Sequence, residues 1–364
     1  MIRMRVVLLV AVLALMSFGA YGLSLCDYRA PMTSLTDAGL SFSYRYYDDG
    51  ATTGVDVDSG RLKFDLDRVF DSPDIGYSFS GVAEVTLAQL LPVGWLGQGT
   101  GTFRYYLMED TPLFAFGGAE GSMASGLPSL EIRAGVGYGR FTDVTPLAKA
   151  MTIQTELLDL DALSAKLPDD VLMSIAEVIG REIEYETIKA WVADIEALIE
   201  ASAGVDLDAR ALLTIEEVLL TSGDDRMCGW AVQAGIGYEV IDPLGAVRDI
   251  VLAASADAAF AAGPTDQWLF HASFSGPFDI LEENTLSATL GYELELEEDS
   301  ILLADYALQR VQSGDDVSVS HAATLSLTFD VGGADVGASL SLVKDASVDA
   351  WSIDLSLSAA MDLL

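Results

Sequence analysis

Few groups in this chain could perform catalysis, and they are widely separated. The 364 residues include only two histidines, His271 and His321, and two cysteines. His271 lies in the polar phase of an alternating segment, where a histidine could act as a general base toward a serine. A lone histidine there is far more often a simple polar side chain. The sequence has no Gly-x-Ser-x-Gly, His-Glu-x-x-His or Cys-x-x-Cys motif. We therefore expect no enzyme activity.

Two further patterns could hold a ligand. Residues 135–139 read Gly-Val-Gly-Tyr-Gly, which resembles a phosphate-binding loop only superficially because it lies inside a strand pattern, where glycines indicate crowding. Acidic clusters could bind Ca²⁺ but lack the ligand spacing of a calcium loop; they are Glu282-Glu283, Glu297-Glu298-Asp299 and Asp315-Asp316. We expect crowded interior glycines, solvated turn acids, and neither a metal site nor a cofactor.

The charge balance restricts the class of partner. The chain has 56 acidic residues against 19 basic ones, a formal net charge of −37. Nucleic acid is excluded as an expected partner, because no basic patch is available for phosphates. An acidic surface would favour cations or cationic partners. Acidic loops could equally serve only to keep the protein soluble in transit.

The first 22 residues are typical of a signal peptide. Arg3 and Arg5 precede an uncharged apolar run over 6–16, and small residues stand before a cut at Leu23. A lipoprotein cut before Cys26 is the competing interpretation, but it would need a small residue where Leu25 stands. Hydrophobic residues make up 51% of the chain, yet no later run is long enough for a spanning helix.

The elements that carry these residues alternate apolar with small or polar residues. The clearest segment, 317–331, keeps a period of two throughout. Similar segments over 38–142 and 228–364 predict about 14 strands, within 12–16, most of them longer than globular strands. Residues 23–37 appear as an irregular segment, and longer loops are expected at 48–59 and 88–98. This pattern predicts an all-β, antiparallel, up-and-down membrane barrel.

Charged residues fall almost entirely in the polar phase of these segments. A barrel in lipid demands this segregation, because a lipid-facing charge is costly at the bilayer midplane. A half-buried soluble sheet would also show it. The candidate lumen-facing charges are Arg45, Lys63, Asp65, Glu84, Arg104, Glu131, Arg133, Asp257, His271, Glu293, Glu295 and Asp330.

Residues 143–227 change to a helical period and predict an insert of three or four helices. Pro146 and Pro168 stand where helices can begin. Counted from the N-terminus, the insert is the sixth connection between strands. It should therefore lie on the periplasmic side or plug the lumen from below, whereas a miscounted strand would place it outside. The same count puts Cys26 and Cys228 on one side, as a candidate disulfide or as two unpaired thiols.

Over 38–142 and 228–364 the chain resembles the outer-membrane β-barrel proteins of diderm bacteria. The resemblance is architectural and implies membrane lipid and the barrel-assembly machinery as partners, with location in the outer membrane. The chain departs from the pattern in ending on Leu364, where such barrels often have an aromatic residue.

The expected function is a porin-like passive channel for small solutes, with an acidic, cation-preferring lumen. The helical insert would constrict the channel or dock a periplasmic protein. The alternatives are a non-conducting barrel that anchors the insert as an interaction domain, and a secreted soluble β-sandwich.

Overall fold

The computed structural model describes residues 23–29, 32–47, 57–108, 111–124, 127–221, 225–241, 250–296, 300–330, 334–344 and 350–361. They form one antiparallel sheet in which every strand pairs with its neighbours in the chain. The strands are β1 (Thr33–Tyr47), β2 (Val57–Asp71), β3 (Ile75–Ala88), β4 (Leu91–Met108), β5 (Thr111–Ala124), β6 (Leu127–Asp143), β7 (Met227–Ile241), β8 (Ile250–Gly263), β9 (Asp266–Pro277), β10 (Glu283–Leu296), β11 (Ser300–Ser313), β12 (Asp316–Asp330), β13 (Ala334–Lys344) and β14 (Ser352–Met361).

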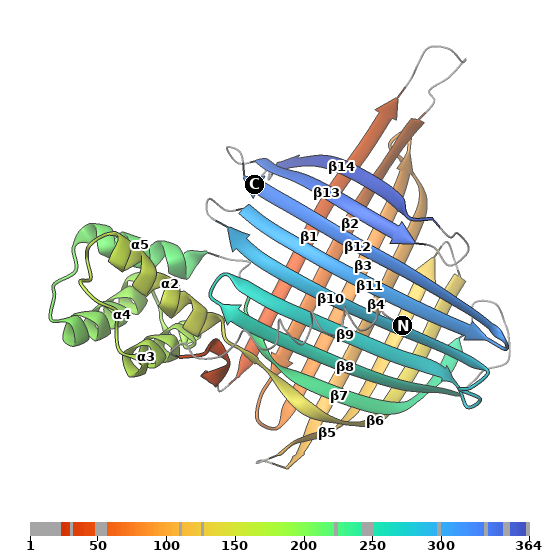
Figure 1. The fold of residues 1–364 in the computed structure, drawn as a ribbon, viewed down its shortest axis with the longest axis horizontal. Helices are drawn as coiled ribbons and strands as arrows, with labels where there is room; N and C mark the ends of the chain where they lie inside the picture. Colours follow the sequence, from red (N-terminus) through yellow and green to blue (C-terminus); the bar gives the residue numbers. More distant parts are fainter. Residues whose placement is uncertain are drawn as a thin grey trace.

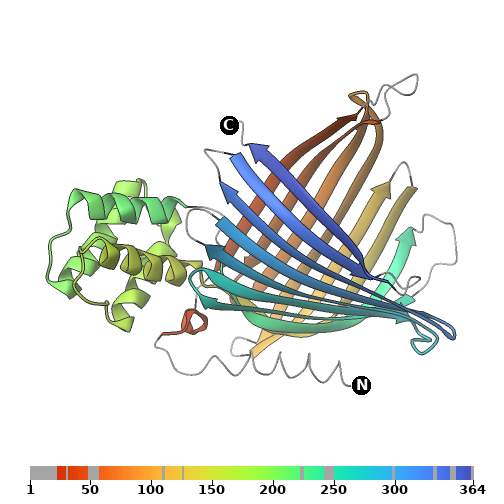
Figure 2. The same ribbon diagram turned by 45° about the horizontal axis from the view of Figure 1, so that its top comes forward.

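The predicted up-and-down arrangement of about 14 strands is confirmed, and so is the helical insert. The sheet is strongly curved, so that β1–β4 lie across from the later strands (Figures 1 and 2). Over the described residues the sheet is not closed, and β1 and β14 are its two edges.

One face of the sheet is apolar across all fourteen strands. Register places Phe270 opposite Leu290, Leu290 opposite Tyr306, and similar residues opposite one another toward both edges. These side chains are not packed on a second layer, since Leu40 is 73% exposed and Leu355 is 72% exposed. A β-sandwich would instead pack two such faces together. The main buried apolar cluster lies in the helical insert and not against the sheet's apolar face.

The β6 and β7 backbones approach closely along the seam between them. Glycines of the polar face meet across it, with Gly135 opposite Gly235. A Cβ on Gly137 would collide with the Phe114 ring and the Val232 carbonyl oxygen, and Gly139 has φ +122°. The Gly-Val-Gly-Tyr-Gly segment therefore allows two backbones to approach closely. Glycine is used where two strand backbones approach this closely because it has no side chain.

The insert comprises α2 (Thr145–Asp159), α3 (Asp169–Ile179), α4 (Ile188–Ala203) and α5 (Ala209–Leu220). Two of its helices begin at the expected prolines, Pro146 and Pro168. Pro146 lies in the first turn of α2, and the Asp208 side chain accepts a hydrogen bond from the Ala211 backbone N–H. Gly204 ends α4 in the left-handed conformation. No helix in the described part of the chain is long and apolar enough to cross a membrane.

Two expected boundaries were wrong. The loop expected over 88–98 is only a turn at Gln89 and Leu90, because β4 already begins at Leu91. Pro92 and the glycines of β4 leave few side chains in alternation, which hid the strand. The first strand begins at Thr33, five residues before the expected start of the barrel at residue 38. The expected signal peptide, 1–22, lies outside the described residues.

Candidate functional site: the polar inner face

The face opposite the apolar rows is polar and concave. A cavity of about 660 Å³ lies against it and is lined by residues from both halves of the sheet, before and after the helical insert. Its wall includes Arg104 of β4, Gln233 of β7, Asp257 of β8 and His271 of β9. We call this surface the inner face. The sheet's curvature therefore encloses polar side chains and leaves the apolar ones outside.

The candidate charged residues occupy register positions on the inner face. The described side chains are Lys63, Asp65, Glu84, Arg104, Glu131, Arg133, Asp257, His271, Glu293 and Glu295. Arg45 pairs with Ser59 and Asp330 with Asp335 through the backbone ladder. The side chains of Arg45 and Asp330 lie outside the described set.

Many of these charges are neutralised by a neighbour on the same face. Glu84 pairs with Arg61 at 3.0 Å, and Lys63 pairs with Asp65 at 2.6 Å. Arg133 contacts Glu131 on its own strand and Glu120 on β5, the latter at 2.7 Å. Sequence reasoning missed Arg61 and Glu120; the register of adjacent strands, which brings them to their partners, is not visible in single segments.

His271 and Asp257 form the arrangement closest to an acid–base dyad. They lie directly opposite each other on β9 and β8, and His271 Nδ1 is 2.5 Å from Asp257 Oδ1. A carboxylate on Nδ1 can orient an imidazole for catalysis, but a nucleophile must then meet the other nitrogen. Among the described residues, no serine or threonine hydroxyl is hydrogen-bonded to His271. The pair serves here as a polar contact on the cavity wall.

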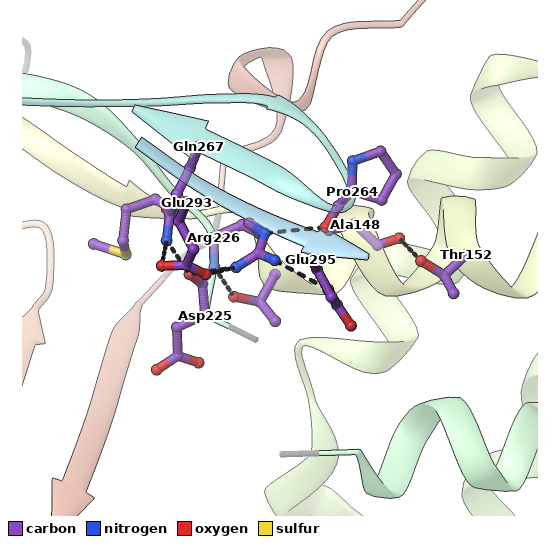
Figure 3. Close-up of polar contacts among 10 residues, drawn as sticks. Ala148, Thr152, Asp225, Arg226, Pro264, Gln267, Glu293 and Glu295 are labelled. Atoms are coloured by element: carbon purple, nitrogen blue, oxygen red, sulfur yellow. Dashed lines mark hydrogen bonds and ion pairs between the residues drawn. The ribbon is translucent and has the colours of Figure 1, made fainter. Parts of the chain in front are cut away.

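Arg226 fixes the root of the helical insert, a role that the sequence analysis did not predict. Its side chain is only 1% exposed. It donates from Nη1 to Glu293 Oε1 at 2.8 Å, from Nη2 to Glu295 Oε2 at 3.1 Å and from Nε to the Pro264 carbonyl at 3.0 Å (Figure 3). Glu293 and Glu295 are therefore held at the end of the sheet by a buried cation. In the sequence, Arg226 follows two aspartates and resembles a solvated turn.

The two ends of the insert are also tied to each other. The Arg226 backbone N–H donates to Thr145 Oγ1 at 2.9 Å, and the Val144 N–H donates to the Arg226 carbonyl at 2.8 Å. Gln267 of β9 donates to the Asp225 carbonyl at 3.0 Å. Asp225 and Arg226, which precede β7, are thus bonded to β9, to β10 and to the turn between β8 and β9.

A short N-terminal segment, residues 25–28, also holds the insert in place. The short helix η1 (Leu25–Asp27) carries Cys26, which forms a disulfide with Cys228 of β7. Tyr28 is buried against the insert, where its hydroxyl donates to the Ala176 carbonyl at 3.3 Å. Burial raises the pKa of Tyr28 to about 12, so the neutral phenol is the favoured form. The sequence had left the pairing of the two cysteines open.

The insert lies beyond the ends of the strands and not between the curved walls of the sheet (Figures 1 and 2). It shares this end with the β2–β3 and β8–β9 turns, as the count of connections predicted. A plug inside the lumen is not the arrangement seen.

Comparison with protein-family models found no match, and comparison with curated proteins found none either. Function is therefore inferred from the two faces of the sheet and from the insert at its end.

Proposed function

We propose that the sheet closes between β1 and β14 into a barrel that spans an outer membrane as a porin-like passive channel for small solutes. The continuous, exposed apolar face carries this proposal. In hydrocarbon an open edge would leave backbone groups without partners, which only a closed barrel avoids. The strands have 10 to 18 residues, and a tilted membrane strand needs about 9–11. Residues 1–22 would direct export, and the barrel-assembly machinery would insert the protein.

The inner face supports a preference for cations. Three of its four described bases, Arg61, Lys63 and Arg133, are engaged with carboxylates, whereas Arg104 has no ion pair among the described side chains. In contrast, Glu239, Asp305 and Asp354 have no ion-pair partner among the described side chains. Unpaired acids in a confined aqueous space raise the local concentration of cations.

Conductance in planar bilayers tests the proposal. We expect the full-length protein to conduct, with a reversal potential in a salt gradient that shows cation preference. The variant Glu239→Gln/Asp305→Asn/Asp354→Asn should keep its conductance but lose most of that preference. A control with the same charge change on the insert, Asp170→Asn/Glu182→Gln/Glu196→Gln, should not. Absence of conductance from a folded, inserted protein would contradict the channel.

An anchor for the helical insert is the second candidate, favoured by the way the insert is held. The disulfide, Tyr28 and Arg226 fix the insert at the sheet's end. A non-conducting protein would favour this role, with the insert presented to a periplasmic protein. Recording with and without residues 143–227 separates the roles, because a conducting barrel does not require the insert.

A further inference from the structure

Apart from tyrosines, few residues with ionisable side chains have register positions on the apolar face, and most of them are basic. Register assigns seven Asp, Glu, Lys, Arg or His positions of the strands to that face: Asp58, Arg68, Arg140, Asp266, Arg310, His321 and Lys344. The Arg140 side chain, however, reaches Asp71 of the inner face at 3.7 Å. Without Arg140, four of these positions are basic and two are acidic, whereas Asp and Glu outnumber Lys and Arg 56 to 19 in the chain. The composition alone would lead to the opposite ratio. The apolar face therefore selects for positive charge at the few places where it carries any.

Three of these residues form a row across adjacent strands at the end of the sheet far from the insert. Lys344, the last residue of β13, lies directly opposite His321 of β12. Arg310 of β11 is diagonal to His321, since it pairs with Val319 two residues earlier, and β11 ends three residues later at Ser313. We call Arg310, His321 and Lys344 the basic row.

Aromatic and amide groups hold two members of the basic row, His321 and Arg310, in place. The Tyr306 hydroxyl is 2.8 Å from His321 Nδ1, and the Trp351 ring lies 6.2 Å from the His321 ring. Arg310 donates to Asn284 Oδ1 at 2.8 Å and to Gln312 Oε1 at 2.6 Å. Both of these partners are neutral amides, so they orient the guanidinium without cancelling its charge.

A positive group on a lipid-facing wall needs an anion nearby. Its cost is high at the bilayer midplane and falls toward the interface, where aromatic side chains also gather. Phosphate oxygens of lipid headgroups are the anions present at that depth, and they accept charge-assisted hydrogen bonds from guanidinium and ammonium groups. We propose that the basic row binds the phosphate of an anionic lipid in the leaflet at this end of the barrel. The inference rests on the proposed membrane-spanning barrel.

Native mass spectrometry of the full chain in detergent tests the binding, with phosphatidylglycerol, phosphatidylcholine and inorganic phosphate as probes. We expect a clear preference for phosphatidylglycerol over the other two. The variant Arg310→Gln/His321→Gln/Lys344→Gln should bind phosphatidylglycerol roughly 30-fold more weakly, given the contribution of each basic side chain near an anionic surface. The control Arg61→Gln/Lys63→Gln/Arg133→Gln removes as many basic groups from the inner face and should bind as the parent does.

The outcomes separate this inference from the proposal beneath it. Equal phosphatidylglycerol binding by parent and basic-row variant overturns the inference, as does an equal loss in the control. Inorganic phosphate that competes as well as lipid would also overturn it, in favour of a free-anion site. Insertion into neutral phosphatidylcholine vesicles is measured in parallel by flotation. A protein that floats with the vesicles but shows no lipid preference overturns only the proposed lipid binding by the basic row. A protein that does not float with the vesicles overturns the proposed membrane barrel as well.

Discussion

Replacement of Gly137 by valine is expected to prevent the sheet from folding. A Cβ at this position would collide with the Phe114 ring and with the Val232 carbonyl oxygen across the β6–β7 seam. Flexible side chains can move aside, but a paired backbone cannot do so without breaking the ladder. Overpacking of a core lowers the free energy of unfolding by about 1–3 kcal/mol, occasionally more. A clash with backbone should cost an amount near the top of this range. Over the described residues, this seam is the backbone ladder that joins the two halves of the sheet.

The measurement is heat-modifiable migration on a gel, which reports the folded fraction after refolding into detergent. Gly97→Val is the matched control, because a Cβ on Gly97 of β4 meets nothing within 4 Å. We expect the control to refold like the parent and Gly137→Val to remain in the unfolded band. Equal folded fractions for the two variants would show that the seam is not as tight as described.

Replacement of Arg226 by methionine is expected to destabilise the root of the insert by about 3–5 kcal/mol, the usual cost of removing one partner from a buried ion pair. Methionine retains most of the volume but leaves Glu293 and Glu295 without the cation that holds them. The Pro264 carbonyl also loses its donor. The loss should appear as a lower denaturant midpoint, together with faster proteolysis near Asp225 and Arg226.

Arg61→Met provides the comparison. Arg61 also pairs with a glutamate of the sheet, Glu84, but its side chain is 61% exposed. Exposed pairs contribute about 0–1 kcal/mol, so the midpoint should change little. If Arg226→Met is no more destabilising than Arg61→Met, the insert is not held by this contact.

The alternation of apolar and polar residues was sufficient to predict most of the strands and their two faces. A period of two is set by the geometry of a single strand, so it predicts strands and faces without knowledge of their neighbours. Two prolines, Pro146 and Pro168, likewise marked helix starts locally. The pattern failed where side chains are missing: Pro92 and the nearby glycines of β4 gave no alternation to detect. Whether β1 meets β14 depends on curvature summed over the whole sheet, which no segment encodes.

The candidate site was predictable only to the level of a face. Polar phase placed Lys63, Glu131 and His271 on one side of the sheet, but their ion partners depend on register between strands. Arg226 was missed because burial of a turn residue is a tertiary property. Strand parity placed the two cysteines at one end, yet pairing also requires a short distance, here 5.3 Å between the Cα atoms of Cys26 and Cys228.

The most direct test of the barrel uses spin labels on single cysteines at neighbouring positions in a reconstituted bilayer. Leu325 and Ser326 of β12 lie on opposite faces, as do Leu340 and Ser341 of β13. We predict that labels at Leu325 and Leu340 are reached by lipid-soluble oxygen, and that labels at Ser326 and Ser341 are reached by a water-soluble nickel complex. Equal access of the nickel complex to both members of each pair, or the reverse alternation, would contradict an apolar face turned toward hydrocarbon.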